Sequence, residues 1–178
     1  MRAMRTALVI VDTQEVLIPV VWQGAELADR IADLADRARA KGAEVIALQQ
    51  VGGPMFEPGA PGTALAHRLR LRPADTVIQK TATDGFYRTT LDDTLRGTDA
   101  DTIVLAGVAT DYCVDATVRA AVSRGFDVIL VEDGHSTVAD PEAGLTAGQI
   151  IARHNRILGR AVHPGGTVTV RPAGKIFI

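Results

Sequence analysis

Three polar residues that could together perform acyl transfer each follow an apolar stretch of the sequence. Asp12 follows the run ALVIV, Lys80 ends the run DTVIQK, and Cys113, the only cysteine, comes shortly after VLAG. A thiolate is a strong nucleophile, and a carboxylate can accept the thiol proton and return it to a leaving amine. An ammonium group near the sulfur favours the charged form of the thiol. The three residue types therefore predict attack on an amide-type carbonyl.

The position of Cys113 favours a nucleophile over packing material, although a lone cysteine is usually a small buried hydrophobe. With Thr110 as the N-cap of a helix from about residue 110 to 124, Cys113 lies in the first turn, where free N–H groups favour a thiolate. The helix dipole contributes only about 0.3–1 kcal/mol at an exposed site, so a charged partner is required. Lys80 is the candidate partner, although a solvated lysine, like an Asp12 that only caps a turn, remains the alternative.

Alternating strand-like and helix-like segments must position these residues. Apolar, β-branched runs predict strands, and 3.6-residue periodicity predicts helices, the last of which begins with Asp140 as N-cap and Pro141 at its first position. This alternation predicts an α/β fold, a three-layer sandwich with a six-stranded parallel sheet whose functional residues gather at the carboxyl ends of the strands. The predicted strands are 7–11, 44–50, 75–80, 101–107, 126–133 and 167–170, and the predicted helices are 25–41, 89–97, 110–124 and 140–158.

Composition limits the possible partners of the chain. The 178 residues suit a single domain spanning 1–178, and the near-neutral net charge of −2 without a basic block argues against nucleic-acid binding. One cysteine excludes an internal disulfide, and no apolar run reaches the roughly 18 residues that span a bilayer. The N-terminal apolar run is too short for a signal core, so we expect a cytoplasmic protein that acts on a small molecule.

Three segments resemble those of the isochorismatase-like cysteine hydrolases, a family that includes nicotinamidase, N-carbamoylsarcosine amidohydrolase, ureidoacrylate amidohydrolase and streptothricin hydrolase. They occur in the expected order and span residues 7 to about 158. The segments are ALVIVDTQ, VIQKTATDGFYRTTLDDTLRG and VLAGVATDYCVDATVRAAVSRGFDVILVEDGHST.

The resemblance implies a catalytic triad of Asp12, Lys80 and Cys113 on a six-stranded parallel sheet with Rossmann-like topology. It also implies a cis peptide bond between Val108 and Ala109 that directs the N–H groups of Ala109 and Cys113 at the oxyanion. Family members are commonly dimers or tetramers, so the resemblance implies a homodimer or homotetramer.

The chain departs from the nicotinamidase pattern at the metal site. Nicotinamidases carry an Asp-x-His pair and a further histidine after the second strand, whereas here the region after residue 50 contains His67 alone and no aspartate up to that point. One histidine cannot assemble such a site, so we predict no metal and no cofactor. For His135, His154 and His163 we expect structural or surface roles.

Four side chains near the predicted site are candidates for substrate binding: Leu17, Trp22, Phe86 and Tyr112. The chain has only seven aromatic residues, so several near one site indicate a pocket for a small, partly flat molecule. The alternative is that they fill gaps beneath loops.

The sequence therefore predicts a metal-free cysteine amidohydrolase that forms a thioester on Cys113. Two further possibilities remain in the same fold: an enol-ether hydrolase that does not need the thiol, and a nicotinamidase-like deamidase without the metal site. A phospho-accepting receiver domain also has an aspartate and a lysine at strand ends, but it needs an acidic cluster for magnesium, and VDTQ contains a single acid. The loop 52–62, rich in glycine and proline, is either a connector or part of the pocket.

Overall fold

The computed structural model describes residues 5–178, so residues 1–4 of the predicted 1–178 domain lie outside the described residues. Residues 5–178 form six strands and four α-helices, which alternate except between the second and third strands, where two 3-10 turns lie. A π-helical turn at Thr110–Val114 leads directly into the third helix. The strands are β1 (Thr6–Val11), β2 (Glu44–Gln50), β3 (Thr76–Lys80), β4 (Thr102–Val108), β5 (Asp127–Ser136) and β6 (Val168–Arg171). The helices are α1 (Gly24–Ala40), α2 (Leu91–Gly97), α3 (Asp115–Ser123) and α4 (Ala147–Leu158).

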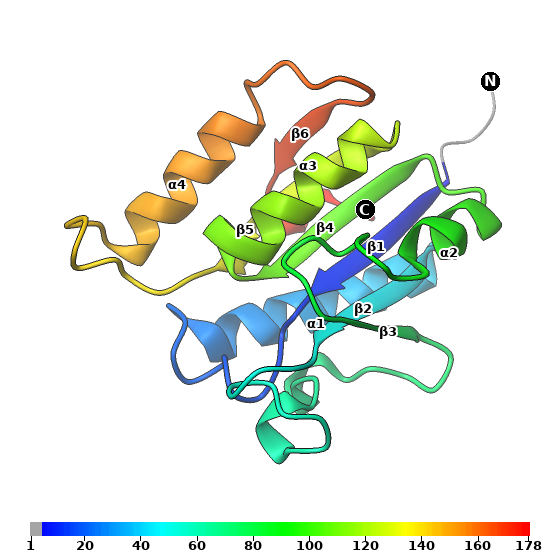
Figure 1. Ribbon diagram of the computed structural model, residues 1–178. Coiled ribbons are helices and arrows are strands. Elements are labelled where there is room, and N and C mark those ends of the chain that lie inside the picture. Colours follow the sequence, from blue (N-terminus) through cyan, green and yellow to red (C-terminus); the bar gives the residue numbers. More distant parts are fainter. Residues whose placement is uncertain (1–4) are drawn as a thin grey trace.

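All neighbouring strands pair in parallel, in the order β3-β2-β1-β4-β5-β6. The order reverses beside β1, which is the first strand and lies in the middle of the sheet. Helix α1 covers one face, while α3 and α4 cover the other (Figure 1). The predicted α/β sandwich with a six-stranded parallel sheet is confirmed.

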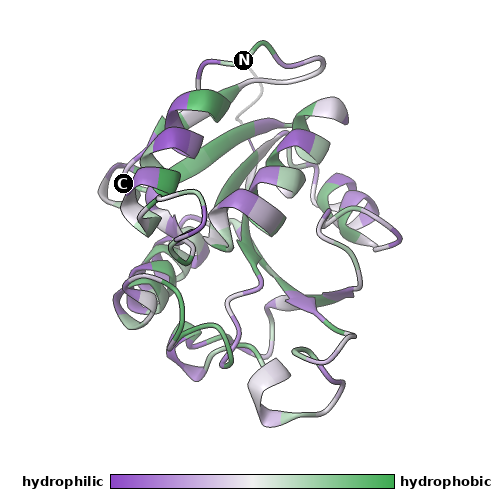
Figure 2. Cartoon of the chain, turned by 60° about the vertical axis from the view of Figure 1, so that its left-hand side comes forward, coloured by the Kyte–Doolittle hydropathy of each residue, from purple (hydrophilic) through white to green (hydrophobic). Residues whose placement is uncertain are grey.

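Both faces of the central strands are buried, which explains why these strands are continuous apolar runs and do not alternate with polar residues. In β1, Val9 and Val11 pack toward α3, whereas Leu8 and Ile10 pack toward α1. Figure 2 shows the hydrophobic colour along the strands, whereas the helices carry both hydrophobic and hydrophilic residues. The C-terminal tail adds Ala173 and Ile176 to the core on the α1 side.

The last helix begins later than predicted. Asp140 pairs with Leu145 in an isolated bridge, and its side chain accepts a hydrogen bond from the Ala143 amide, so this segment forms a turn. Helix α4 begins after Thr146, which forms a reciprocal capping box with Gln149. The prediction of a helix from Asp140 and Pro141 was therefore wrong, because an aspartate before a proline is equally suited to a turn.

No described helix is both long and apolar enough to cross a membrane.

Gly107 lets β4 pass close to the end of β1. Its φ is +128°, and a Cβ atom placed there would lie 2.1 Å from the carbonyl oxygen of Val11. Only glycine fits this conformation without strain. This close approach fixes the end of β4 at Val108, and the segment that begins at Ala109 then leads to Cys113.

We predict that Gly107→Ala lowers the free energy of unfolding by more than about 2 kcal/mol, because both the backbone conformation and the contact with Val11 are lost. The matched control is Gly148→Ala in α4, where a Cβ would meet nothing within 4 Å and alanine should stabilise the helix by up to about 1 kcal/mol. Urea unfolding of both variants makes the comparison. Equal stability of the two variants would contradict this account of Gly107.

Candidate active site

An ion pair forms where β1, β2 and β3 end. The Nζ atom of Lys80 lies 2.6 Å from Oδ2 of Asp12, and the two side chains are 0% and 2% exposed. Because β2 lies between the two strands, which places them about 10 Å apart at the usual spacing, the long lysine side chain is needed to bridge them. The sheet order therefore brings together two residues that are 68 positions apart in the sequence.

Two further oxygens surround the Lys80 ammonium. The side-chain oxygen of Gln50 accepts a hydrogen bond at 2.6 Å, and the carbonyl oxygen of Ala82 accepts one at 2.9 Å. Gln50 is the register partner of Lys80 and lies at the end of the intervening strand. Our sequence analysis missed Gln50, although its position at the end of a predicted strand was a usable signal.

Cys113 completes the group predicted from the sequence. Its Sγ atom lies 3.4 Å from Nζ of Lys80, and the residue is only partly buried. The three side chains are thus in one place, and Cys113 is half-buried.

Burial raises the pKa of the Cys113 thiol to about 12, the Asp12 carboxylate adds to the rise, and Lys80 opposes it. Burial also raises the pKa of Asp12, and the positive charge of Lys80 opposes that rise. Our sequence analysis expected Lys80 and the helix N-terminus to favour the thiolate. Lys80 acts in the expected direction, but the loss of solvation outweighs it.

The main chain before Cys113 turns sharply. The peptide bond between Val108 and Ala109 is cis, and the carbonyl of Ala109 then accepts hydrogen bonds from the amides of Tyr112 and Val114, both at 3.1 Å. Cys113 lies in this π-helical turn and not in the first turn of an α-helix. The Ala109 and Cys113 amides, which our sequence analysis assigned to an oxyanion hole with Val108, belong to the same turn, and that role stays a prediction.

Thr110 does not cap its helix as predicted. Ala109 occupies the N-cap position without a side-chain hydrogen bond, and the hydroxyl of Thr110 lies 2.8 Å from Nδ1 of His135 instead. His135 is buried, and its Nε2 lies 2.8 Å from Oδ1 of Asn155 in α4. The expected structural role of His135 is therefore specific: it links α4 to the π-helical turn Thr110–Val114, which carries Cys113 and is called the cysteine turn below.

The four predicted substrate contacts lie in different surroundings. Phe86 is buried in the core on the α3 side, where it stacks on Phe126, while Leu17 packs against the core on the α1 side. Trp22 and Tyr112 are exposed. A role for these four residues in substrate binding stays a prediction.

The described residues contain no group of three or more His, Cys, Asp or Glu side chains that could hold a metal ion. His67, the histidine considered at the position of the nicotinamidase site, is exposed and pairs with Glu15. The absence of a metal in the reaction stays a prediction.

Comparison with known proteins identifies the family of this fold and site. The Isochorismatase domain model matches residues 6–153, which include Asp12, Lys80 and Cys113. The chain belongs to the isochorismatase family. The resemblance seen in the sequence is thereby confirmed.

Individual relatives in this family are named as hydrolases or amidases. The chain is 38% identical over 143 residues to a streptothricin hydrolase of Streptomyces noursei, covering 77% of this chain and 56% of that protein. The crystal structure of an isochorismatase family protein has a TM-score of 0.82 at 28% identity, covering 92% of this chain and 97% of the other. That of N-carbamoylsarcosine amidase from Thermoplasma acidophilum has a TM-score of 0.78 at 26% identity, covering 97% of this chain and 99% of the other. The chain spans about half the length of the streptothricin hydrolases that it matches.

We predict that iodoacetamide alkylates Cys113 with a rate that rises about tenfold per pH unit up to pH 10 without a plateau, because the thiol pKa is about 12. At pH 8, Asp12→Asn should accelerate alkylation by removing a negative charge, and Lys80→Met should slow it by removing a positive one. Since Cys113 is the only cysteine, intact-protein mass spectrometry follows the reaction directly. A plateau below pH 8 would show instead that the free protein holds a thiolate.

The buried His135 should make the stability of the fold depend on pH. Burial lowers the pKa of His135 from 6.5 to about 4, so between these values the unfolded chain binds a proton that the folded chain does not. The free energy of unfolding should therefore fall as the pH decreases from about 6.5 to about 4. His135→Leu should lose this part of the pH dependence, while His163→Gln, a change in the loop after α4, should keep it. Urea unfolding at several pH values measures the slopes, and equal slopes for wild type and His135→Leu would refute the assignment.

Proposed function

We propose that the chain is a cysteine hydrolase that cleaves the C–N bond of an amide-type group in a small molecule through a thioester on Cys113, without a metal. One observation carries the proposal: the Lys80 ammonium lies 2.6 Å from Asp12 and 3.4 Å from the sulfur of a partly exposed cysteine. The named relatives support the reaction class, since streptothricin hydrolase and N-carbamoylsarcosine amidase are among them.

In the first step, the thiol of Cys113 loses its proton as its sulfur attacks the substrate. Asp12 takes the proton of Cys113 as the sulfur attacks the carbonyl carbon, so the thiolate need not accumulate beforehand. Lys80 lies beside both groups and stabilises the negative charge as it moves from the carboxylate to the sulfur. The carbonyl oxygen becomes an anion, which the N–H groups of Ala109 and Cys113 stabilise.

Collapse of this intermediate breaks the C–N bond. Asp12 returns the proton to the leaving nitrogen, which departs as ammonia or an amine and leaves an acyl group on Cys113. Asp12 then accepts a proton from water as the water attacks the thioester. The products are a carboxylic acid and a Cys113 thiol that has regained its proton from Asp12.

The raised pKa of Asp12 favours a second candidate, hydrolysis of an enol ether such as isochorismate. In that reaction a protonated Asp12 would donate to the substrate, and Cys113 would not form a bond. The two candidates differ in whether the reaction needs the sulfur.

A panel of small amides, ureas, lactams and nicotinamide tests the amidohydrolase directly. We expect wild type to release ammonia or amine with at least one of them, equally with and without a chelator, and to form a covalent adduct that intact-protein mass spectrometry detects with a slow substrate. Cys113→Ala should form no adduct and lose at least about a thousandfold in kcat. Activity that a chelator abolishes would contradict the metal-free reaction, and full activity of Cys113→Ala on an enol ether would favour the second candidate.

A further inference from the structure

A chain of hydrogen bonds connects the cysteine turn to α4 through the buried His135 and the half-buried Asn155. The side-chain nitrogen Nδ2 of Asn155 donates to the main-chain carbonyl of Glu132 at 3.0 Å. The side-chain oxygen Oδ1 of Asn155 therefore faces His135 and accepts from its Nε2–H. Nδ1 of His135 is then the acceptor, and Thr110 donates its hydroxyl proton to it. His135 is thus a neutral ring with both nitrogens used, and it is 3% exposed, while Thr110 is 0% exposed.

The two residues after His135 also make hydrogen bonds to other segments, Thr137 to the cysteine turn and Ser136 to the main chain of Trp22. Thr137 donates its hydroxyl proton to the carboxylate of Asp111 at 2.5 Å. Ser136 donates to the carbonyl of Trp22 at 2.6 Å, and the amide of Trp22 donates to the carbonyl of Thr137. Three consecutive buried residues at the end of β5 therefore hold the first two residues of the cysteine turn and the main chain of Trp22.

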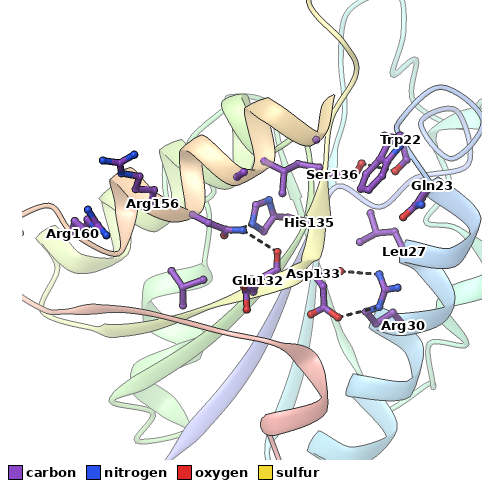
Figure 3. A pocket seen from close by; sticks show the side chains of 15 residues that line it. Trp22, Gln23, Leu27, Arg30, Glu132, Asp133, His135, Ser136, Arg156 and Arg160 are labelled. Atoms are coloured by element: carbon purple, nitrogen blue, oxygen red, sulfur yellow. Dashed lines mark hydrogen bonds and ion pairs between the residues drawn. The ribbon is translucent and has the colours of Figure 1, made fainter. Parts of the chain in front are cut away.

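His135 and Ser136 also line a cavity of about 640 Å³ between α1 and α4 that does not include the cysteine. Figure 3 shows the two residues between the α4 side of the cavity and Trp22. His135 therefore separates this cavity from the cysteine turn.

We propose that His135 is a positioning residue for Cys113. It acts through Thr110, the first residue of the π-helical turn that carries the sulfur. π-Helical turns are rare and occur frequently at functional sites, and here the hydroxyl of Thr110 is directed to His135 and does not cap its own helix. A shift of about 1 Å at a reacting atom can cost a hundredfold in rate, and a displaced turn would change the 3.4 Å contact between Cys113 and Lys80. The link to turnover rests on the proposed function, whereas the link to the position of the sulfur does not.

Alkylation of Cys113 by iodoacetamide at pH 8 tests the position of the sulfur without a substrate. His135→Leu and Thr110→Val should each be alkylated at least about threefold faster than wild type, because a released turn exposes the sulfur to water and lowers its pKa. Thr110→Ser keeps the hydroxyl and should react at the wild-type rate. The double variant should react no faster than the faster single variant, since both changes break one link.

Val122→Ala is the matched control, because Val122 is buried in α3 and makes none of these contacts. It should lose stability but be alkylated at the wild-type rate. Wild-type rates in His135→Leu and Thr110→Val, multiplied effects in the double variant, or equal acceleration in Val122→Ala would each overturn the proposal. If His135→Leu does not fold, the pair Thr110→Val and Thr110→Ser still decides.

Turnover separates this proposal from the proposed function. With an active substrate, Thr110→Val should lower kcat about 10- to 100-fold with KM within about threefold, and Thr110→Ser should restore kcat. An unchanged kcat in Thr110→Val overturns the positioning role while leaving the hydrolase intact. Absence of any hydrolytic turnover in wild type refutes the hydrolase, and the alkylation rates then decide the role of His135 alone.

Discussion

The contact between the Lys80 ammonium and the Asp12 carboxylate organises the carboxyl end of the sheet. Both charges are removed from water, and an unpaired buried charge costs several kcal/mol, so each residue lowers the cost of burying the other. The contact is possible only because β2 separates their strands by one position and because Gln50, at the end of β2, supplies an additional oxygen. A change of register between β2 and β3 would remove both contacts at once.

The same burial determines the chemistry available to the sulfur. A lysine beside a cysteine favours a thiolate in water, but here the lysine charge is already balanced by a carboxylate and the sulfur is partly desolvated. The pKa of the thiol is therefore raised to about 12. In the proposed reaction, a proton moves from the sulfur to the carboxylate next to a fixed positive charge. Preorganisation of this kind stabilises a transition state more than a resting state.

The end of β5 contacts the turn that carries Cys113, through the hydrogen bond between His135 and Thr110. β5 continues to Ser136, three residues beyond the predicted end at residue 133, with a register shift against β4 between Leu105 and Gly107. This extension carries His135 and Ser136 along β4 to the base of the cysteine turn, and Thr137 follows directly. The ends of β4 and β5 therefore both contact the turn that carries the sulfur, although neither strand contributes an ionisable group to the ion pair.

The sequence by itself determined the layer architecture, because runs of apolar, β-branched residues between amphipathic segments can be buried only in a parallel sheet covered on both faces. It also identified Asp12, Lys80 and Cys113, because each follows a predicted strand and the ends of parallel strands lie together. The tertiary structure alone decided that Gln50 and Ala82 join the lysine, that Thr110 bonds to His135, and that α4 begins at Ala147. It also decided that burial raises the pKa of the thiol by more than Lys80 lowers it. These features depend on how far each group is from water and from charges remote in sequence, and a linear pattern of residue types does not record those distances.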